Sequence, residues 1–391
     1  MDILFVNNIF PLFAKADSGA SVRSMRIINA LTKLGHVDVV SFLDDEVSNL
    51  EQCDVVYSNY ISEASASFYK SKMIRMMCHR YDISDIWPIN EQKNEVVKKI
   101  INDKHYDLIV VRYMKMACEC GLLEYADRLV IDIDDDPKAV ARMFNPGKKW
   151  RHRLFWHYVY ANCVAAVTDR IVEKVHAAFN SQPEKHYPNT TYLPNISNYA
   201  DALPDVEFST TPPNILFVGR MDHKPNVESL EYFITKIFPI LLQSHPSATL
   251  RVVGNIKDPK LSQICRSTPN VILCGFVENL LNEYKQSRCV VVPLLSGTGT
   301  SVKLIEAMSL NRAVVTTSKG CRGLNKNFIQ GEDYLLADDI NQFVECVSAL
   351  LDNESLNHKI SNNAKRKVAK YYSEDSFNAI IREKILSRYE C

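Results

Sequence analysis

A glycine-rich loop with a lysine and a glutamate close behind it is the part of this chain best suited to bind a charged ligand. The apolar run 289–294 leads into the loop, Lys303 and Glu306 follow in an amphipathic segment, and the loop itself reads Ser296-Gly297-Thr298-Gly299-Thr300-Ser301. Glycine lets backbone N–H groups approach an anion without interference from a Cβ atom, and a helix start adds partial positive charge. The loop can therefore hold a diphosphate while Glu306 accepts hydrogen bonds from a ribose. A tight turn in an ordinary α/β unit is the alternative interpretation.

A second group of charged residues follows another apolar run. Residues 215–218 are apolar, and Gly219, Arg220 and, four positions later, Lys224 come next. Two cations placed after a strand can bind an anionic group. Two solvated cations in a surface turn are the alternative.

Short apolar strands alternate with amphipathic helices through the first half of the chain. The pattern predicts a helix over 20–34 and strands over 3–6, 37–42, 55–57, 108–111, 129–133 and 164–167. These strands are apolar on both faces, as buried parallel strands are. The alternation predicts a doubly wound parallel sheet, with ligands at the carboxyl ends of its strands.

The alternation starts again after a segment rich in threonine and proline. It predicts helices over 227–242, 280–286 and 340–386 (the last in two or three pieces) and strands over 215–218, 249–253, 271–274, 289–293 and 313–317. The expected organisation is a first domain over 1–195, a linker over 196–213, a second domain over 214–370, and a C-terminal helix over 371–391 that packs back on the first domain.

Composition is that of a globular protein. The 391 residues are 46% apolar and 24% charged, and acidic and basic residues balance at 46 each, so the total charge gives no support for a nucleic-acid partner. Eleven scattered cysteines favour reduced, buried thiols. The chain opens directly on a strand pattern and has no apolar run of membrane-spanning length, which together predict a cytoplasmic protein.

In their order and spacing, these motifs resemble the GT-B retaining glycosyltransferases of family 4, also called glycosyl transferases group 1, of the type that builds bacterial surface polysaccharides. The resemblance extends over essentially the whole chain and is most specific over 215–324. It implies an α/β protein with two Rossmann-like, doubly wound parallel-sheet domains that face each other across a cleft. It also implies transfer of a sugar from a nucleotide-diphosphate sugar to a hydroxyl, with retained anomeric configuration and without a metal.

The resemblance carries site roles onto matching positions. The catalytic positions are Arg220, Lys224, Glu306 and Asp134. The donor-binding positions are Gly19, Gly219, Phe276, Val277, Gly297, Thr298, Gly299, Thr300 and Lys303, and Arg23 is a further candidate for phosphate contact. Thr298 stands where the family usually has a first glutamate, so a carboxylate that supports an oxocarbenium-like transition state is missing here.

The acidic run 131–137 allows several interpretations. Asp132 and Asp134 fit the Asp-x-Asp pair of manganese-dependent transferases of the other major fold, but the doubled α/β pattern favours the metal-independent fold. In the resemblance, Asp134 and Asp135 face the cleft, where mutual repulsion raises a carboxyl pKa and suits acceptor binding or proton transfer. A helix start rich in acidic residues is the alternative.

The stretch 148–158 interleaves aromatic residues with the cations Lys148, Lys149, Arg151 and Arg153. On a helix, such a stretch can lie on the anionic inner surface of a membrane and bring the enzyme to a glycan or polyprenyl-linked acceptor. A partly buried helix with a solvated face is the alternative, and no fold motif supports nucleic-acid binding.

Two other functions compete with glycosyl transfer. A nucleotide-sugar epimerase shares the GT-B fold but needs acid/base groups in the cleft. A non-catalytic, transferase-like subunit would keep donor binding without turnover, and the threonine at position 298 motivates that idea.

Overall fold

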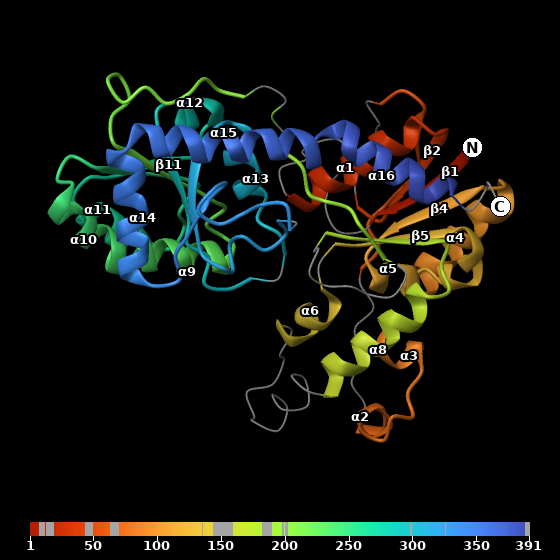
Figure 1. The fold of residues 1–391 in the computed structure, drawn as a ribbon. Coiled ribbons are helices and arrows are strands. Elements are labelled where there is room, and N and C mark those ends of the chain that lie inside the picture. Colours follow the sequence, from red (N-terminus) through yellow and green to blue (C-terminus); the bar gives the residue numbers. More distant parts are fainter. Residues whose placement is uncertain are drawn as a thin grey trace. The chain divides into compact units, whose positions relative to one another are not determined.

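The computed structural model describes residues 1–7, 12, 19–43, 50–62, 70–134, 136–143, 159–181, 190–197, 199, 202–297, 299–324 and 326–387 (Figure 1). Contacts between residues divide the chain into two compact units. The first unit is Met1–Pro194 together with Phe377–Cys391, and the second is Asn195–Ser376.

The first unit is built on a seven-stranded sheet in the order β3-β2-β1-β4-β5-β6-β7. Every pairing between neighbouring strands is parallel. The strands are β1 (Asp2–Asn7), β2 (His36–Ser41), β3 (Cys53–Ser58), β4 (Leu108–Arg112), β5 (Leu129–Asp134), β6 (Ala177–Asn180) and β7 (Thr190–Tyr192).

Helices connect these strands. They are α1 (Gly19–Thr32), α2 (Lys70–Met77), α3 (Ile83–Ile86), α4 (Glu91–Asp103), α5 (Met114–Glu119), the 3₁₀ turn η1 (Leu122–Arg128), α6 (Pro137–Met143) and α8 (Ala161–Val172). Alternate residues of the central strands, such as Leu4, Ile109 and Ile131, join side chains of α4, α5 and α8 in one buried apolar cluster. Burial of the strands on both faces accounts for their continuous apolar runs.

The strand predicted over 164–167 is wrong, because these residues lie inside α8. The buried residues of α8 include Val164, Val167, Thr168 and Ile171, which follow the spacing of a helix face. A short apolar run cannot by itself distinguish a buried strand from a buried helix segment. The strand at this position in the fold is β6, which begins ten residues further on, at Ala177.

The second unit repeats the arrangement with a six-stranded sheet in the order β10-β9-β8-β11-β12-β13, again parallel throughout. Its strands are β8 (Asn214–Val218), β9 (Thr249–Val253), β10 (Val271–Gly275), β11 (Cys289–Val292), β12 (Ala313–Thr316) and β13 (Leu335–Leu336). Both sheets contain the strand order of a doubly wound dinucleotide-binding fold. The prediction of two Rossmann-like parallel-sheet domains is confirmed.

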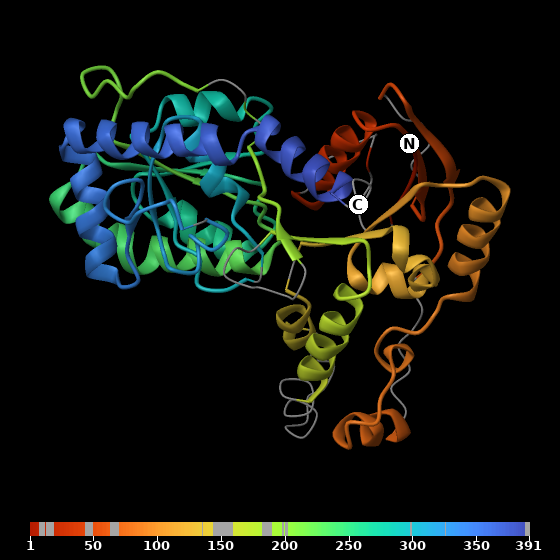
Figure 2. The same cartoon turned by 45° about the vertical axis from the view of Figure 1, so that its right-hand side comes forward.

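Helices cover both faces of the second sheet (Figures 1 and 2). One side carries α12 (Leu280–Lys285), α13 (Val302–Ser309) and α15 (Glu354–Tyr371). The other carries α9 (Lys224–Tyr232), the π-helical turn Phe233–Ile237, α10 (Phe238–Ser244), α11 (Pro259–Ser267) and α14 (Ile340–Asp352). The single helix expected over 227–242 is therefore interrupted by the π-helical turn, which is followed by Pro239 in the first turn of α10.

The segment expected as a linker, 196–213, is attached to the second unit along its described residues. The Arg288 guanidinium donates to the carbonyls of Phe208 and Thr211, and Arg312 donates to that of Pro204. At the other end of the chain, α16 (Glu374–Leu386) enters the first unit, where the His176 ring nitrogen Nε2 lies 3.1 Å from the Ile385 carbonyl. In the part of the chain that the structure describes, no helix is both long and apolar enough to cross a membrane.

Candidate active site

The glycine loop of the second unit lies between the carboxyl end of β11 and the start of α13. Gly297 has a φ of +116°, a conformation that side chains other than glycine rarely adopt. Ser301 occupies the N-cap position of α13, and its buried Oγ has no hydrogen-bond partner among the described residues. The local structure is the strand–loop–helix unit expected from the sequence, with a polar group left available at the helix start.

Lys303 is the cation that the fold brings to the end of β8. Its ammonium donates to Asn226 Oδ1 at 2.6 Å and lies 5.6 Å from the centre of the Phe217 ring. A Cβ atom added to Gly219 would lie 3.2 Å from Lys303 Nζ, so the glycine leaves room directly beside the ammonium. Burial lowers the pKa of Lys303 to about 8, although Glu306 opposes this shift.

Arg220 and Lys224 are exposed in the structure. The Arg220 guanidinium forms two hydrogen bonds with the Asp222 carboxylate, at 2.7 and 3.2 Å, and both side chains are more than half exposed. Lys224 is the first residue of α9, its side chain is 84% exposed, and its ammonium lies 3.5 Å from Glu228. Of the two predicted lysines, Lys303 is the one that the structure places against Gly219.

Glu306 lies on α13, one turn after Lys303, and is partly buried. Burial and the charge of Glu306 raise the pKa of Tyr199 to about 12, and they also raise the pKa of Tyr284. The two tyrosine rings pack edge to face with their centres 6.4 Å apart. The Tyr284 hydroxyl is buried without a hydrogen-bond partner among the described residues. Glu306 is therefore a carboxylate beside apolar rings, an environment that strengthens its hydrogen bonds.

The turn after β10 carries the residues predicted to lie beside a nucleotide base. Gly275 has a φ of +67°, the Phe276 side chain is 82% exposed, and Val277 is partly buried. Gly254, which the sequence analysis did not identify, contacts both this turn and the end of β8. Gly254 donates to the Gly275 carbonyl at 2.8 Å, and a Cβ atom added to Gly254 would lie 2.0 Å from the Gly219 carbonyl oxygen.

In the first unit, Arg23 of α1 and Arg112 of β4 neutralise the Asp-x-Asp pair at the end of β5. Asp132 is fully buried and receives hydrogen bonds from Arg23 at 2.7 and 2.9 Å, and Arg112 Nε lies 2.8 Å from it. Asp134 lies 2.7 Å from Arg112 and 3.6 Å from Arg23. Burial by itself would lower the pKa of Arg23, but Asp132 and Asp134 raise it overall, so the guanidinium stays charged.

This arrangement corrects the expectation for Arg23. Arg23 is not available for a phosphate, because its guanidinium is buried and is bonded to Asp132 and to the carbonyls of Leu193 and Pro194. The expected repulsion between Asp134 and Asp135 stays a prediction, because Asp135 lies outside the described residues, but Arg112 and Arg23 offset the charge of Asp134. The alternative interpretation of the acidic run, an acidic helix start, applies to Asp136. Its carboxylate accepts a hydrogen bond from the Lys138 amide in the first turn of α6.

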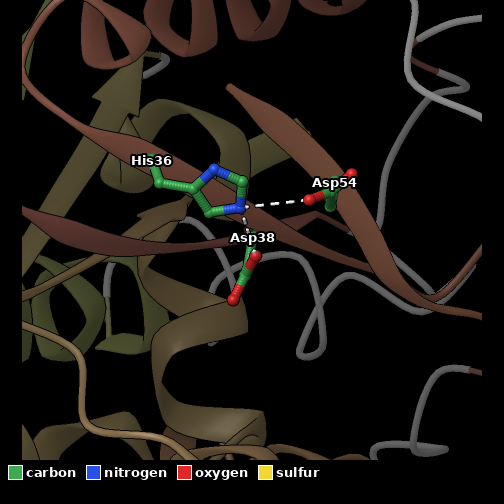
Figure 3. A group of neighbouring side chains, drawn as sticks. All are labelled: His36, Asp38 and Asp54. Atoms are coloured by element: carbon green, nitrogen blue, oxygen red, sulfur yellow. Dashed lines mark hydrogen bonds and ion pairs between the residues drawn. The ribbon is translucent and has the colours of Figure 1, made fainter. Parts of the chain in front are cut away.

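A histidine and two aspartates meet where β2 and β3 begin (Figure 3). His36 Nε2 lies 3.1 Å from Asp38 Oδ1 and 3.2 Å from Asp54 Oδ2, and among the described residues these side chains are close enough to share a cation. The second oxygen of Asp38 already accepts from Tyr106 at 2.8 Å and from Lys104 at 2.9 Å. Lys104 therefore already supplies positive charge to this cluster. Because the cluster lies at the amino ends of the strands, we assign it a structural role.

Several predicted residues lie outside the described residues, namely Thr298, Asp135, Lys148, Lys149, Arg151 and Arg153. Gly19 is described as the exposed first residue of α1. Gly299 and Thr300 are described, and the Asn195 side-chain amide donates to the Thr300 hydroxyl.

Two residues beside the glycine loop escaped the sequence analysis as site residues. Asn226 holds the Lys303 ammonium, and Arg322 approaches Gly297 from the turn after β12. Arg322 could have been found, because it follows a predicted parallel strand next to β11, and ligand-contacting residues gather at the carboxyl ends of such strands. No comparable signal marks Asn226.

Solved structures with the same fold span almost the whole chain. Sucrose-phosphate synthase from Thermosynechococcus elongatus superposes with a TM-score of 0.70 at 15% identity, covering 100% of this chain and 99% of that one. A glycosyltransferase from Rickettsia africae gives 0.65 at 12% identity, covering 100% and 98%. HepE of Anabaena, in complex with UDP and glucose, gives 0.62 at 14% identity, covering 98% and 99%. The fold is therefore that of the GT-B class.

A shared fold does not identify a reaction, so sequence comparison is needed to indicate the class of enzyme. Residues 212–353 match the family model described as "Glycosyl transferases group 1". An uncharacterized 44.6 kDa protein in the cps region of Klebsiella pneumoniae is 21% identical over 381 residues, covering 94% of this chain and 96% of that protein. The protein is a GT-B glycosyltransferase whose second unit carries the group 1 sequence pattern, and the resemblance drawn from the sequence is confirmed.

Proposed function

We propose that the protein is a retaining glycosyltransferase that moves a sugar from a nucleotide-diphosphate sugar to a hydroxyl of a glycan or a lipid-linked glycan in bacterial surface-polysaccharide synthesis. The observation that carries the proposal is the position of the Lys303 ammonium beside Gly219, within the region that matches group 1 glycosyltransferases. The HepE complex with UDP and glucose and the cps-region relative support the donor class and the biological role.

The described residues suggest how the donor is held. Lys303 and Arg220 would neutralise the diphosphate, with Lys224 as a more distant cation, and the amides of 297–300 would line the pocket. Glu306 would bind the ribose, and Phe276 and Val277 would flank the base. Catalysis of this kind depends on position and electrostatic stabilisation and needs no protein nucleophile.

On the acceptor side we propose Asp134 as a hydrogen-bond acceptor for the incoming hydroxyl. Its side chain is 14% exposed, so part of the carboxylate is accessible. Asp134 already accepts a hydrogen bond from Arg112 at 2.7 Å, and a second one from the acceptor hydroxyl would use the same carboxylate. The same arginine contact makes Asp132 and Asp134 a poor pair of ligands for a divalent cation, and we propose that transfer is independent of metal.

The test of this function is nucleotide release from a panel of nucleotide sugars, with and without acceptor glycans. A thermal-shift screen first selects the donors that stabilise the protein. Release that requires an acceptor and survives EDTA supports metal-independent transfer. An epimerase would convert the sugar without releasing nucleotide, and a non-catalytic subunit would bind a donor without turnover. Complete loss in EDTA that a metal restores would overturn metal independence.

Donor affinity is expected to fall as the pH rises through about 8, the pKa of Lys303. The bound diphosphate favours the charged ammonium, so the complex holds a proton that the free protein loses at higher pH. The dissociation constant should increase by up to about tenfold per pH unit above 8. Calorimetry between pH 7 and 9.5 measures this. The matched variant Lys303→Gln should bind weakly at every pH, and a flat profile for the wild type would contradict the assignment.

Replacing Glu306 with glutamine should weaken the binding of the nucleoside diphosphate by roughly 1.5–3 kcal/mol, the contribution of a hydrogen bond to a charged group. The substitution keeps the shape of the side chain but removes the charged acceptor. Calorimetry with the nucleoside diphosphate measures the change. Glu345→Gln, an exposed change on α14, serves as the control. An unchanged dissociation constant for the Glu306 variant would show that this carboxylate does not contact the ribose.

Contact with the inner surface of the membrane is proposed for the basic–aromatic stretch 148–158. In the first unit, α2 has exposed apolar side chains at Ile74 and Met77, 53% and 61% exposed, and it also carries Lys72, while its Arg75 is paired with Asp85. Each cation near an anionic bilayer contributes about 1 kcal/mol, so attachment should be reversible and sensitive to salt.

Liposome flotation tests this contact. The protein should float with anionic vesicles, stay behind with neutral ones, and detach in high salt. Changing Lys148, Lys149, Arg151 and Arg153 to serine or glutamine should reduce flotation. A wild-type protein that ignores anionic vesicles would favour a soluble acceptor.

A further inference from the structure

The turn after β12, residues 319–323, is fixed against the glycine loop. Gly323 has a φ of +92°, and a Cβ atom added there would lie 2.2 Å from the Thr300 side chain. At the other end of the turn, a Cβ atom on Gly320 would lie 2.2 Å from Thr316 Oγ1 and 2.7 Å from the Val292 carbonyl oxygen. Both glycines allow contacts that a larger residue would prevent, so the turn and the loop hold a defined relative position.

Arg322 extends from this turn to the glycine loop. Its Nε donates to the Lys319 carbonyl at 3.0 Å, which orients the guanidinium. A Cβ atom added to Gly297 would lie 3.4 Å from the second terminal nitrogen of Arg322 and 3.8 Å from the Pro225 ring. The two terminal nitrogens have no hydrogen-bond or ion-pair partner among the described residues, and the side chain is only partly exposed. A positioned guanidinium without an anion thus borders the loop.

Among the residues that the structure describes, no carboxylate forms an ion pair with Arg322. Residues 296–301 are serine, threonine and glycine only. The carboxylate of Glu228 accepts from Ser296 at 2.8 Å and lies 3.5 Å from Lys224, while Glu306 lies on α13 next to Lys303. The carboxylate that reaches the loop is thus engaged with Ser296 and Lys224, and among the described residues Arg322 forms no ion pair, so an anionic ligand can supply its counter-charge.

A guanidinium fork matches a carboxylate or a phosphate with two parallel hydrogen bonds. In the function proposed above, the diphosphate is held by Lys303, Arg220 and the loop amides, which leaves Arg322 for a different anionic group. We propose that Arg322 selects a donor whose sugar carries a carboxylate, that is, a nucleotide-linked uronic acid. This inference rests on the proposed function and names the substrate class of the same site.

Binding measurements with matched ligands test the inference. For the wild type, UDP, UDP-glucose and UDP-glucuronic acid are compared by calorimetry, and GDP, GDP-mannose and GDP-mannuronic acid form the parallel set for the other base. The uronic acid should bind on the order of 10- to 100-fold more tightly than the neutral sugar, as expected for a charge-assisted pair. Arg322→Gln should remove this preference and leave the nucleoside diphosphate unchanged. Arg322→Lys should keep part of the preference, and the exposed Lys326→Gln all of it.

The remaining outcomes overturn the inference in distinguishable ways. If Arg322→Gln weakens the nucleoside diphosphate, the neutral sugar and the uronic acid equally, Arg322 is a diphosphate ligand. If the wild type shows no preference for the uronic acid in the set that binds, the donor sugar is neutral. If no nucleotide of either set binds, the proposed function itself fails.

Discussion

Replacing Lys303 with methionine is expected to lower turnover on the order of a hundredfold, comparable to the loss of one preorganised donor at a transition state. Methionine keeps most of the volume beside Asn226 and Phe217 but removes the charge that we propose neutralises the diphosphate. Burial of the charged ammonium destabilises the folded protein. The methionine variant should therefore be at least as stable as the wild type. Steady-state nucleotide release, together with the thermal midpoint, separates the two effects.

The two cations taken from the sequence pattern serve as comparisons in the same assay. Arg220→Ala should also lower turnover about a hundredfold if its guanidinium leaves Asp222 for the diphosphate. Lys224→Ala should have the smaller effect, because this ammonium is exposed and lies near Glu228. A larger loss for Lys224 than for Lys303, with both variants folded, would reverse the assignment drawn from the structure.

The second large effect concerns stability. Asp132→Asn should destabilise the first unit by about 3 kcal/mol, because it leaves two buried arginines, Arg23 and Arg112, with Asp134 as their one remaining carboxylate in the cluster. Denaturant unfolding measures the midpoint, and hydrogen exchange of amides in β4 and β5 shows whether the loss is confined to this unit.

An exposed ion pair of the same unit provides the control. Lys98 and Glu124 lie 3.1 Å apart, but their side chains are 41% and 57% exposed. Glu124→Gln should therefore change stability by less than about 1 kcal/mol. If Asp132→Asn proved as mild as this control, the buried cluster would not depend on charge compensation.

Local sequence patterns predicted most of the strands. The strand expected over 249–253 has those bounds as β9, and the glycine loop lies between β11 and α13 as expected. The misplaced strand at 164–167 and the unpredicted β6, β7 and β13 are short segments of two to four residues, for which tertiary contacts decide between helix and strand. The π-helical turn between α9 and α10 also had no expected counterpart.

The sequence by itself determined that this protein has two doubly wound halves and a glycine loop before a helix, because alternation of elements and glycine spacing are local properties of the chain. Only the tertiary structure decided which charges lie together. Lys303 meets Asn226 across 77 positions of sequence, and Arg23 meets Asp132 across 109. The carboxyl ends of parallel strands bring such distant residues to one edge of a sheet. Burial at that edge determines which cations are paired with a carboxylate and which face the glycine loop.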